Sequence, residues 1–254
     1  MSLQCLAKII ENQEIAKDIF QLILEGDFVE KIEQPGQFVH LLIPSQKTFL
    51  RRPFSLASYH QDKNQCTILY KILGTGTKEL AQLKKGTSIS LLGPLGNGFF
   101  VNPLYEKVLL IGGGIGIPPL YELGKEFQKK GTEVTFLLGY RNQEEVFYQE
   151  EFAKLGTVIT YTEDGSFGHQ GRIDAAFPTL EKDWNAVYSC GPTPMLKAVK
   201  ENFSNQYPTY LSLEERMACG FGVCYGCVVA QTKKKTPLKV CQDGPVFLAT
   251  EVEL

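Results

Sequence analysis

Four of the seven cysteines of this chain lie close together in its last part, and thiolates are strong ligands for iron. They are Cys219, Cys224, Cys227 and Cys241. Their gaps are four, two and thirteen residues, and the first two gaps follow the plant-type spacing of [2Fe–2S] proteins. Gly220, Gly222 and Gly226 let the backbone bend around the sulfur atoms. The pattern therefore predicts a [2Fe–2S] cluster held by these four thiolates.

A structural zinc site is the alternative interpretation of the same cysteines. Zinc fingers usually offer two close pairs of ligands, whereas here only Cys224 and Cys227 form one. The glycine-rich loop and the first gap of four residues favour the cluster. The last gap is shorter than in plant ferredoxins, so the chain is not a plain ferredoxin. Cys5 and Cys66 lie in strand-like sequence, where we expect them to pack in the core.

A second candidate site is the run Gly112–Pro119, which follows the apolar segment 107–111. Such a turn at the start of a helix suits a pyrophosphate, and Pro119 is well placed in a first helical turn. Cys190-Gly191-Pro192 follows another apolar strand. Because ligands of open α/β sheets bind at the carboxyl ends of strands, the two turns predict a nicotinamide nucleotide cleft. The residues predicted to form it are Gly112, Gly114, Gly116, Pro119, Cys190 and Gly191.

Simpler interpretations of both turns stay open. Gly112–Pro119 departs from the G-x-G-x-x-G fingerprint because Pro119 replaces the last glycine, and a bare tight turn would also explain it. Cys190 is equally compatible with a contact to the nicotinamide ring and with simple burial of a small residue.

The segment Arg51–Ser55 holds two arginines next to a proline, between apolar strands. Arginine binds anions through paired hydrogen bonds, the ring of Phe54 is able to stack, and Ser55 is able to hydrogen-bond a flavin nitrogen. Gly74–Thr77 leads into a helix that we expect over 78–84 with Thr77 as its N-cap, a second phosphate-binding candidate. By composition alone, an exposed basic hairpin and an ordinary capped helix are slightly favoured.

Three stretches of the chain differ in hydrophobic pattern. Residues 1–102 consist of short apolar runs between Pro and Gly turns, such as 38–43 and 67–73, which is typical of an antiparallel sandwich or barrel. Residues 103–210 alternate strands with helices, which predicts a parallel sheet covered by helices on both faces. Residues 211–254 are too few to fill a core, so a metal centre would supply the missing cross-links. We therefore predict three domains with these boundaries.

Composition limits the classes of function. The 254 residues are 43% hydrophobic and 21% charged, as in ordinary globular proteins, and the net charge of −2 gives no basic surplus for nucleic acid. The short basic stretch 233–235 fits a solvated turn. No apolar run approaches the length of a membrane span, and residues 1–17 lack the apolar region of a signal peptide. We therefore expect a cytoplasmic protein that binds neither nucleic acid nor membrane.

These pieces occur in a recognisable order along the chain. Arg52–Ser55 resembles the R-x-Y/F-S/T FAD motif of the ferredoxin–NADP reductase superfamily. Gly112–Pro119 and Cys190-Gly191-Pro192 resemble its nucleotide loop and its C-G-P turn. The segment Glu214–Gly220 and the ending Cys241–Phe247 closely resemble the electron-transfer subunits of dihydroorotate dehydrogenase B, a family within that superfamily. The resemblance covers essentially the whole chain.

The resemblance implies a multidomain fold: an antiparallel six-stranded FAD β-barrel, an α/β parallel-sheet NAD domain and a small C-terminal [2Fe–2S] domain. It implies NAD as substrate and cluster ligation by Cys219, Cys224, Cys227 and Cys241. It implies FAD contacts at Arg52, Pro53, Phe54, Ser55, Leu69, Tyr70, Lys71, Gly76 and Thr77. The implied partner is an FMN-containing dihydroorotate dehydrogenase catalytic subunit, in a heterotetramer with two of each subunit. The implied function is electron transfer between that subunit and NAD+ in pyrimidine (UMP) biosynthesis.

One local feature departs from the superfamily motif. Phe54 stands where tyrosine is common, so the ring remains available for stacking and only the hydroxyl is missing. Arg51 adds a charge to which the sequence assigns no role. NAD rather than NADP is a hypothesis, because carboxylates at Glu163 and Asp164, after a predicted strand, would repel a 2′-phosphate. Arg141, after the second strand, argues mildly the other way.

The three implied cofactors form a chemically ordered series. NADH delivers a hydride, a cluster takes single electrons, and a flavin connects the two, so we expect no catalytic acid or base. His40, His60 and His169 are scattered, and none lies in a nucleophile–base motif. An alternative of the same class is the FAD/[2Fe–2S] subunit of an NAD(P)H:ferredoxin oxidoreductase or of a sulfide dehydrogenase. A zinc-binding or redox-sensing module is the alternative of another class, but it would leave both glycine turns unexplained.

Overall fold

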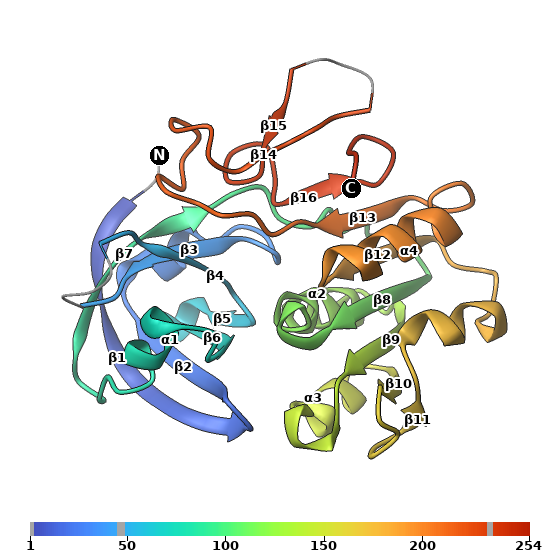
Figure 1. Cartoon of the computed structure of the whole chain (residues 1–254), viewed down its shortest axis with the longest axis horizontal. Helices are drawn as coiled ribbons and strands as arrows, with labels where there is room; N and C mark the ends of the chain where they lie inside the picture. The colour runs from blue at the N-terminus through green and yellow to red at the C-terminus, as the bar shows by residue number, and fades with distance from the viewer. Residues whose placement is uncertain (1–2, 45–48, 233–235) are drawn as a thin grey trace.

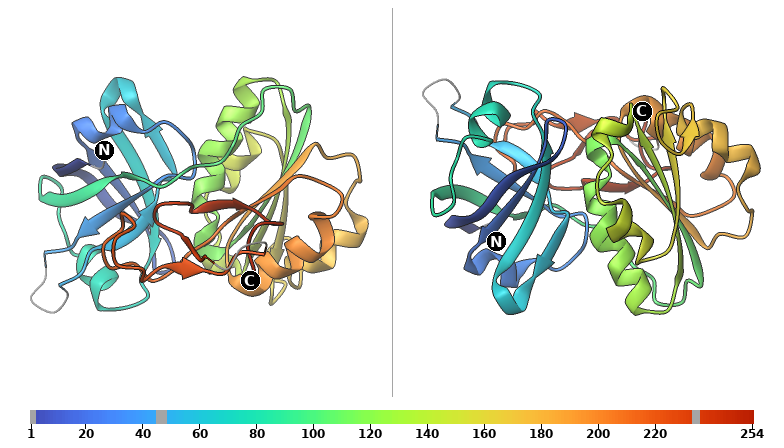
Figure 2. Two further views of the ribbon diagram at one scale, coloured as in Figure 1. Left: turned by 90° about the horizontal axis from the view of Figure 1, so that it is seen from above. Right: turned by 90° about the horizontal axis from the view of Figure 1, so that it is seen from below.

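The computed structural model describes residues 3–44, 49–232 and 236–254 (Figure 1). Two large sheets dominate it, one from the N-terminal part and one from the middle of the chain, and the C-terminal segment lies across both (Figure 2). The basic stretch 233–235 lies outside the described residues. Within the described ranges, no helix combines the length and the apolar character needed to cross a membrane.

The N-terminal sheet is antiparallel and curls into a barrel (Figure 1). Its strands bury alternate side chains, such as Leu22 and Leu24, in one shared core. In chain order they are β1 (Leu3–Ala16), β2 (Ile19–Glu25), β3 (Phe38–Leu42), β4 (Arg52–Ser55), β5 (Ser58–His60), β6 (Gln65–Lys71) and β7 (Ser88–Leu95). Their order in the sheet is β4-β3-β7-β1-β2-β6-β5.

The edge strands β4 and β5 follow each other along the chain, with only Leu56 and Ala57 between them. Because they lie at opposite edges of the sheet, this short link closes the barrel. The N–H of Leu56 donates to the Gln37 carbonyl at 3.2 Å, and the N–H of Ala57 donates to the Thr67 carbonyl at 2.8 Å. The seven observed strands correspond to the six expected if β4 and β5 are counted as one bent strand.

The short helix of the barrel, α1 (Thr75–Leu80), begins three residues before the expected start at residue 78. Gly74 is its N-cap, so the prediction of Thr77 as N-cap was wrong. Thr77 lies in the first turn, where its hydroxyl accepts hydrogen bonds from the N–H groups of Leu73 at 2.9 Å and Gly74 at 3.3 Å. The side chain thus caps the helix from within, as the third helical residue of a capping box does.

The middle of the chain forms the predicted, mostly parallel sheet. Its strands are β8 (Lys107–Gly113), β9 (Glu133–Tyr140), β10 (Thr157–Thr162), β11 (His169–Gln170), β12 (Ala186–Cys190), β13 (Thr209–Ser212) and β16 (Val246–Leu248). Their order is β11-β10-β9-β8-β12-β13-β16, and β16 runs antiparallel to β13. The other neighbours are parallel, so their carboxyl ends share one edge of the sheet.

Helices cover both faces of this sheet. Leu110 of β8 packs with α2 (Pro118–Lys129), whereas the next residue, Ile111, packs with α4 (Thr193–Phe203). Because neighbouring strand residues point to opposite faces, this alternation explains why β8 is apolar along most of its length. The remaining helical elements are α3 (Gln149–Ala153) and 3₁₀ turns at Asp27–Lys31, Gln61–Lys63, Gly114–Gly116, Gln143–Glu145 and Ile173–Thr179.

The C-terminal segment is joined to both sheets. Its strand β16 pairs with β13 and so completes the parallel sheet, while β14 (Val228–Val229) and β15 (Leu238–Lys239) form a small ribbon of their own. On the barrel side, the N–H of Asn97 donates to the Gly244 carbonyl at 2.7 Å. The segment therefore lies over the junction of barrel and parallel sheet (Figure 2). The domain boundaries at 102/103 and 210/211 stay a prediction.

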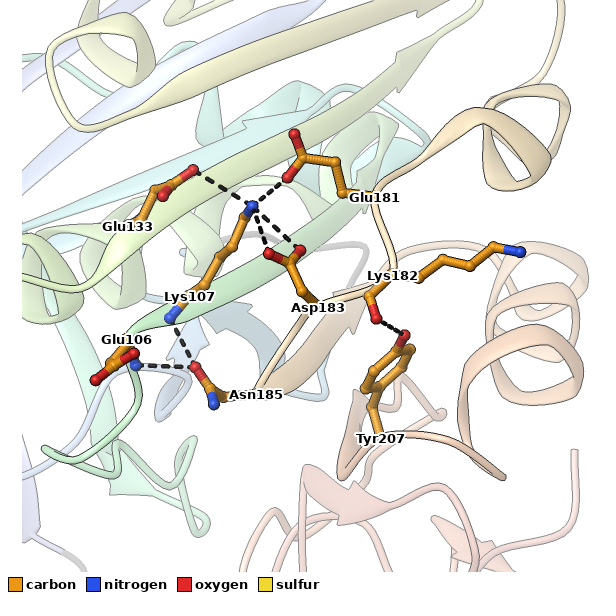
Figure 3. A network of polar contacts seen from close by, with 8 residues as sticks. All are labelled: Glu106, Lys107, Glu133, Glu181, Lys182, Asp183, Asn185 and Tyr207. Atoms are coloured by element: carbon orange, nitrogen blue, oxygen red, sulfur yellow. Dashed lines mark hydrogen bonds and ion pairs between the residues drawn. The ribbon is translucent and has the colours of Figure 1, made fainter.

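A polar network lies at the opposite edge of the parallel sheet, where the strands begin (Figure 3). Lys107, the first residue of β8, forms ion pairs with Glu181, with Asp183 at 3.1 Å and with Glu133 at 3.8 Å. The hydrogen bond to Glu181 is the main cause of a raised pKa of Lys107. Asn185 accepts the N–H of Lys107 at 2.8 Å. Because the carboxylates are exposed, the network tethers the strand starts without adding much stability.

Candidate functional site

A cavity of about 740 Å³, the flavin-sized cavity, lies between the barrel and the C-terminal segment. All nine residues for which the resemblance implies FAD contacts line it, although they come from three separate elements. They are Arg52, Pro53, Phe54 and Ser55 of β4, Leu69, Tyr70 and Lys71 of β6, and Gly76 and Thr77 of α1. A concave site of this volume, with aromatic walls and a few polar groups, is typical of a cofactor pocket.

Two aromatic side chains form a rigid wall of the flavin-sized cavity. Phe54 and Tyr70 meet edge to face, with ring centroids 5.9 Å apart and an angle of 72° between the planes. The Tyr70 hydroxyl donates to Asn12 Oδ1 at 2.9 Å, and burial raises the pKa of Tyr70, so the hydroxyl stays protonated. Such fixed rings present an apolar surface to a flavin ring.

Arg52 brings a positive charge to the same cavity, next to the first turn of α1. Its guanidinium donates to the carbonyl oxygens of Leu50 at 2.7 Å and Arg51 at 3.2 Å, which fixes its direction. A Cβ atom on Gly76 would lie 3.7 Å from Arg52 Nε, so the guanidinium and this turn are in contact. A fixed guanidinium beside a glycine turn suits a pyrophosphate, and the cavity as a whole therefore fits FAD.

A second cavity, of about 460 Å³, opens at the carboxyl ends of β8, β9 and β12 and is called here the nucleotide cavity. Of the six residues predicted for a nicotinamide nucleotide cleft, Gly114, Gly116 and Gly191 line it. The other three, Gly112, Pro119 and Cys190, are buried and do not line it. Burial also raises the pKa of the Cys190 thiol, which stays protonated below the cavity surface.

The two glycine turns of the nucleotide cavity pack backbone against backbone. A Cβ atom on Gly116 would lie 2.5 Å from the Cα of Gly191, and one on Gly191 would lie 3.0 Å from the backbone nitrogen of Gly113. These distances leave no room for a side chain. Glycine at these positions therefore lets the turns form one wall, where backbone groups are able to approach a dinucleotide closely.

The carboxylates considered for nicotinamide specificity occupy different positions. Glu163 lines the nucleotide cavity together with Arg141, whereas Asp164 does not line it. The Asp164 carboxylate instead accepts hydrogen bonds from the hydroxyl of Ser166 at 2.6 Å and from its N–H at 3.0 Å, and both bonds lower the pKa of Asp164. Glu163 is thus the carboxylate of this pair that faces the nucleotide cavity.

The two cavities adjoin, because four residues line both of them. They are Lys71, Leu73, Ile115 and Glu214. Lys71 forms an ion pair with Glu145 at 2.6 Å, and both side chains are largely buried, so the pair joins the barrel to the parallel-sheet part at this point. Glu214 is exposed and faces both cavities, and partial desolvation by the surrounding protein raises its pKa. A nicotinamide in one cavity and a flavin in the other would meet here.

The four predicted cluster ligands fall into two neighbouring pairs. Cys219 lies next to Cys224, and Cys227 lies next to Cys241, whose N–H donates to the Cys227 sulfur at 3.5 Å. Among the described residues, no three His, Cys, Asp or Glu side chains converge in the way that ligands of one metal ion do. A [2Fe–2S] cluster takes two thiolates at each of its two irons, and two pairs of cysteines suit it.

Backbone N–H groups point at the cysteine sulfurs. The Gly222 N–H donates to Cys241 Sγ at 3.1 Å. Burial opposes ionisation of Cys219, but hydrogen bonds from the backbone of the loop, beginning with Cys224, outweigh it and lower the pKa of Cys219 to about 6. Burial and the adjacent Cys227 raise the pKa of Cys241 to about 12. Because such N–H groups also stabilise cluster sulfur, the loop fits an iron–sulfur cluster.

One segment connects the flavin-sized cavity to the cysteines. Residues 212–217 line the cavity, and Cys219 follows Met217 by two residues. Sequence reasoning missed this segment, along with Phe38, Ile115 and Pro245, which also line the cavity. The closeness of 212–217 to the first cysteine was a usable signal, since a cluster and a flavin that exchange electrons must lie near each other. The other lining residues carry no local signal, because packing of distant segments brings them together.

Three family models match consecutive parts of the chain. The oxidoreductase FAD-binding domain matches residues 6–100, and the oxidoreductase NAD-binding domain matches residues 110–201. The iron–sulfur cluster binding domain of dihydroorotate dehydrogenase B matches residues 214–253. The chain thus has the domains of a flavin and iron–sulfur oxidoreductase that uses NAD, in the same order as the two cavities and the cysteines.

Curated relatives match along nearly their whole length. The dihydroorotate dehydrogenase B (NAD(+)), electron transfer subunit of Listeria innocua is 47% identical over 257 residues, which cover 99% of this chain and 100% of that one. The chain belongs to the family of dihydroorotate dehydrogenase B electron-transfer subunits. The member from Fusobacterium nucleatum is 45% identical and is matched over 96% of each chain. An electron-transfer subunit works with a catalytic subunit, so membership of this family implies such a partner.

The electron-transfer subunits share their fold with reductases that serve other partners. The solved NADH-dependent reduced ferredoxin-NADP oxidoreductase superposes with a TM-score of 0.88 at 30% identity, covering 98% of this chain and 90% of that chain. A ferredoxin reductase in carbazole 1,9a-dioxygenase superposes with a TM-score of 0.73 at 20% identity, over 83% and 69% of the two chains. The likeness therefore shows the fold, and it does not identify the electron partner.

Proposed function

We propose that this subunit passes electrons between an FMN-containing dihydroorotate dehydrogenase catalytic subunit and NAD+, in pyrimidine biosynthesis. One observation carries the proposal: the nucleotide cavity shares four lining residues with the flavin-sized cavity, whose far wall leads at Met217 to the cluster loop at Cys219. The 47% identity to the Listeria innocua subunit supports dihydroorotate as the substrate of the partner. The three sites thus lie in the order that the electron path needs.

The residues around each site support its assignment. We assign FAD to the flavin-sized cavity, with Arg52 toward its pyrophosphate and Phe54 toward its ring. We assign NAD to the nucleotide cavity, along the turns at Gly116 and Gly191. The four cysteines of the two pairs hold the cluster. When bound, FAD exchanges a hydride with nicotinamide and single electrons with a cluster, which is chemistry that amino-acid side chains do not supply.

The side chains bind and orient. The ion pair between Lys71 and Glu145 holds the barrel against the parallel-sheet part, and so fixes the distance between the two cavities. Leu73 and Ile115 supply apolar surface where the cavities meet, and this surface excludes water from the place of hydride transfer. No acid or base is required of the chain, because the transferred hydride carries its own electron pair.

The partner surface is proposed around the cluster loop. Leu42, Phe49, Leu50 and Phe221 are exposed apolar residues, and they line one groove together with Arg51 and Cys219. The Arg51 guanidinium donates to the Ser90 carbonyl at 3.0 Å and to its hydroxyl at 2.9 Å, so its charge is fixed inside the apolar groove. Aromatic anchors around a held arginine are typical of protein interfaces. Since Cys219 lines this groove, we assign the groove as the docking surface for the catalytic subunit.

The assembly and the location are part of the same proposal. We propose a heterotetramer with two of each subunit, as the family resemblance implies, and the name of the relatives supports the presence of a catalytic partner. We place it in the cytoplasm, where thiols stay reduced and are able to serve as iron ligands. Binding of nucleic acid or of a membrane is not part of the proposal, since the net charge of −2 gives no basic surplus for either.

The test combines the two subunits. The chain is purified anaerobically with FAD and cluster, mixed with the FMN-type catalytic subunit of the same organism, and followed for NADH formation after dihydroorotate is added. We expect activity only when both subunits are present. No activity from a preparation with full FAD and cluster would contradict the proposed partner. The chain would then join the related ferredoxin oxidoreductases that share its fold.

A single substitution in the groove is expected to weaken the complex. Phe49→Asp puts a charge on a side chain that is 85% exposed, so folding is spared while an apolar anchor is lost. We expect association with the catalytic subunit to weaken at least about 30-fold, the effect of a hot-spot residue. The control is Leu104→Asp, at a side chain that is 82% exposed and does not line the groove. Equal affinity of the two variants, measured by calorimetry, would place the interface elsewhere.

Glu163 is expected to set the preference for NAD. Glu163→Gln removes a carboxylate that faces the nucleotide cavity, and with it the repulsion of a 2′-phosphate. We expect kcat/KM for NADPH to rise about tenfold, equivalent to roughly 1.4 kcal/mol, with little change for NADH. Asp164→Asn is the control, because that carboxylate is held by Ser166 outside the cavity. Reduction of ferricyanide measures kcat/KM for NADPH and for NADH. An equal rise of kcat/KM for NADPH in the two variants would show that Glu163 has no special role.

A further inference from the structure

His40 is a fully buried histidine on β3. Its side chain is 0% exposed, and within the described part of the chain neither Nδ1 nor Nε2 makes a hydrogen bond. Leaving a buried polar group unpaired costs about 1–3 kcal/mol. An apolar side chain would avoid this cost, so the imidazole needs an explanation beyond packing.

The imidazole lies against the cluster loop. A Cβ atom on Gly220 would come within 2.5 Å of His40 Nδ1, so only a glycine at position 220 leaves room for the ring. Gly220 also has a φ of +80°, which favours glycine independently. The ring is also close to the backbone of Cys219, the first predicted cluster ligand, and to the backbone of Arg51. The unpaired Nδ1 therefore lies beside the cysteine loop.

The strand that carries His40 also forms part of the flavin-sized cavity. Phe38 is two residues earlier on β3, hence on the same face of the strand, and it lines that cavity. His40 pairs across the sheet with Pro53 of β4, which lines the cavity as well. The C-terminal segment crosses above this part of the barrel (Figure 1). One strand thus contacts both the flavin-sized cavity and the cluster loop.

The backbone of His40 is held from the other side. Arg51 donates to the His40 carbonyl at 3.3 Å and to the Ser90 carbonyl at 3.0 Å, and so ties β3 to β7 next to the ring. A braced strand fixes where the imidazole points. Because the strand is braced, the imidazole does not have to move in order to donate a hydrogen bond to a cluster ligand.

We propose that His40 is a positioning residue for the cluster, and that its ring N–H donates a hydrogen bond to the loop at Cys219 when the cluster is bound. The inference rests on the proposed function only in taking Cys219 as a ligand. The hydrogen bond ties the first ligand to β3, and so to the wall of the flavin-sized cavity. A donor near the cluster also favours the added negative charge of its reduced state, which raises its reduction potential.

Two substitutions separate a hydrogen bond from simple filling of space. His40→Leu keeps an apolar side chain of moderate size and removes the donor, whereas His40→Gln keeps an N–H. The full chain with FAD and cluster is titrated potentiometrically, and the reduced cluster is recorded by electron paramagnetic resonance. We expect His40→Leu to shift the cluster potential to more negative values and to change the resonance, while His40→Gln stays close to wild type. The FAD potential should stay the same in both.

Val39→Ala is the matched control on the same strand. Val39 packs in the barrel core on the opposite face, so this variant should lose thermal stability without changing the cluster potential or the resonance. A His40→Leu protein with full cluster and a wild-type potential and resonance would overturn the proposal. If His40→Leu loses its cluster, retention of the cluster by His40→Gln supports the proposed hydrogen bond from His40. Loss of the cluster from both variants overturns the proposal.

These readouts need no partner subunit. Failure of the dihydroorotate assay would therefore contradict the proposed function and leave the assignment of His40 intact. Conversely, unchanged spectra in His40→Leu would remove the assignment while the partner assay still succeeds.

Discussion

Replacing Cys224 with serine is expected to abolish dihydroorotate-dependent reduction of NAD+ while leaving oxidation of NADH by ferricyanide within about twofold. A serine hydroxyl does not ionise near neutral pH as a thiol beside iron does, so the cluster loses one of its four ligands. Loss of an outer-shell partner alone typically costs a metal site about 10- to 100-fold, and loss of a ligand should cost more. NADH oxidation is spared because the nucleotide cavity adjoins the flavin-sized cavity without the loop.

The comparison variant is Cys5→Ser, at a half-buried cysteine on β1 that lies outside the two ligand pairs. It should retain iron, acid-labile sulfide and both activities. Iron content and both rates are measured on the same preparations of each protein. A Cys224→Ser protein without cluster that still couples dihydroorotate to NAD+ would show that electrons reach the flavin by another route.

The features predicted correctly from the sequence are local ones. The cysteine spacing indicates an iron–sulfur domain from within one loop, while the assignment of Cys219, Cys224 and Cys227 as ligands stays a prediction. The glycine turn after β8 needs only a strand before it and a helix after it. The two sheets follow from the periods of apolar residues, which neighbouring positions decide. The boundary error at α1 is of the same kind: two cap arrangements compete within one turn, and the hydroxyl of Thr77 is able to serve either.

The features that the sequence did not reveal depend on contacts between distant segments. Glu214 lines both cavities because the C-terminal segment folds back over the barrel and the parallel sheet, and Ile115 does so because the turn after β8 contacts β6 of the barrel. Cys190 follows a strand just as a ligand-binding residue would, yet it is buried below the nucleotide cavity. His40 is one of three histidines scattered along the sequence. Its proposed role depends on Gly220, which the fold places next to its ring. Local sequence patterns do not predict such contacts between distant segments.

Substituting Gly116 with alanine is expected to disable the NAD site and to spare the rest of the path. The new Cβ would lie 2.5 Å from the Cα of Gly191, which is a backbone atom and is not able to rotate away. Overpacking of this kind typically costs about 1–3 kcal/mol, and here it pushes apart the two turns that form the nucleotide cavity. If the free energy of nucleotide binding is weakened by the same amount, KM for NADH rises up to about 100-fold. Dihydroorotate should still reduce the flavin through the catalytic subunit.

Gly131→Ala distinguishes a site effect from general destabilisation of the same part of the chain. Gly131 has a φ of +78° at the end of α2 with open space around it, so alanine adds backbone strain of about 1–2 kcal/mol far from the nucleotide cavity. Both variants should unfold at lower temperature than wild type. Only Gly116→Ala should raise KM for NADH in the ferricyanide assay, with FAD content unchanged. If Gly131→Ala raises KM equally, the close approach of the two glycine turns is a requirement of folding and not of NAD binding.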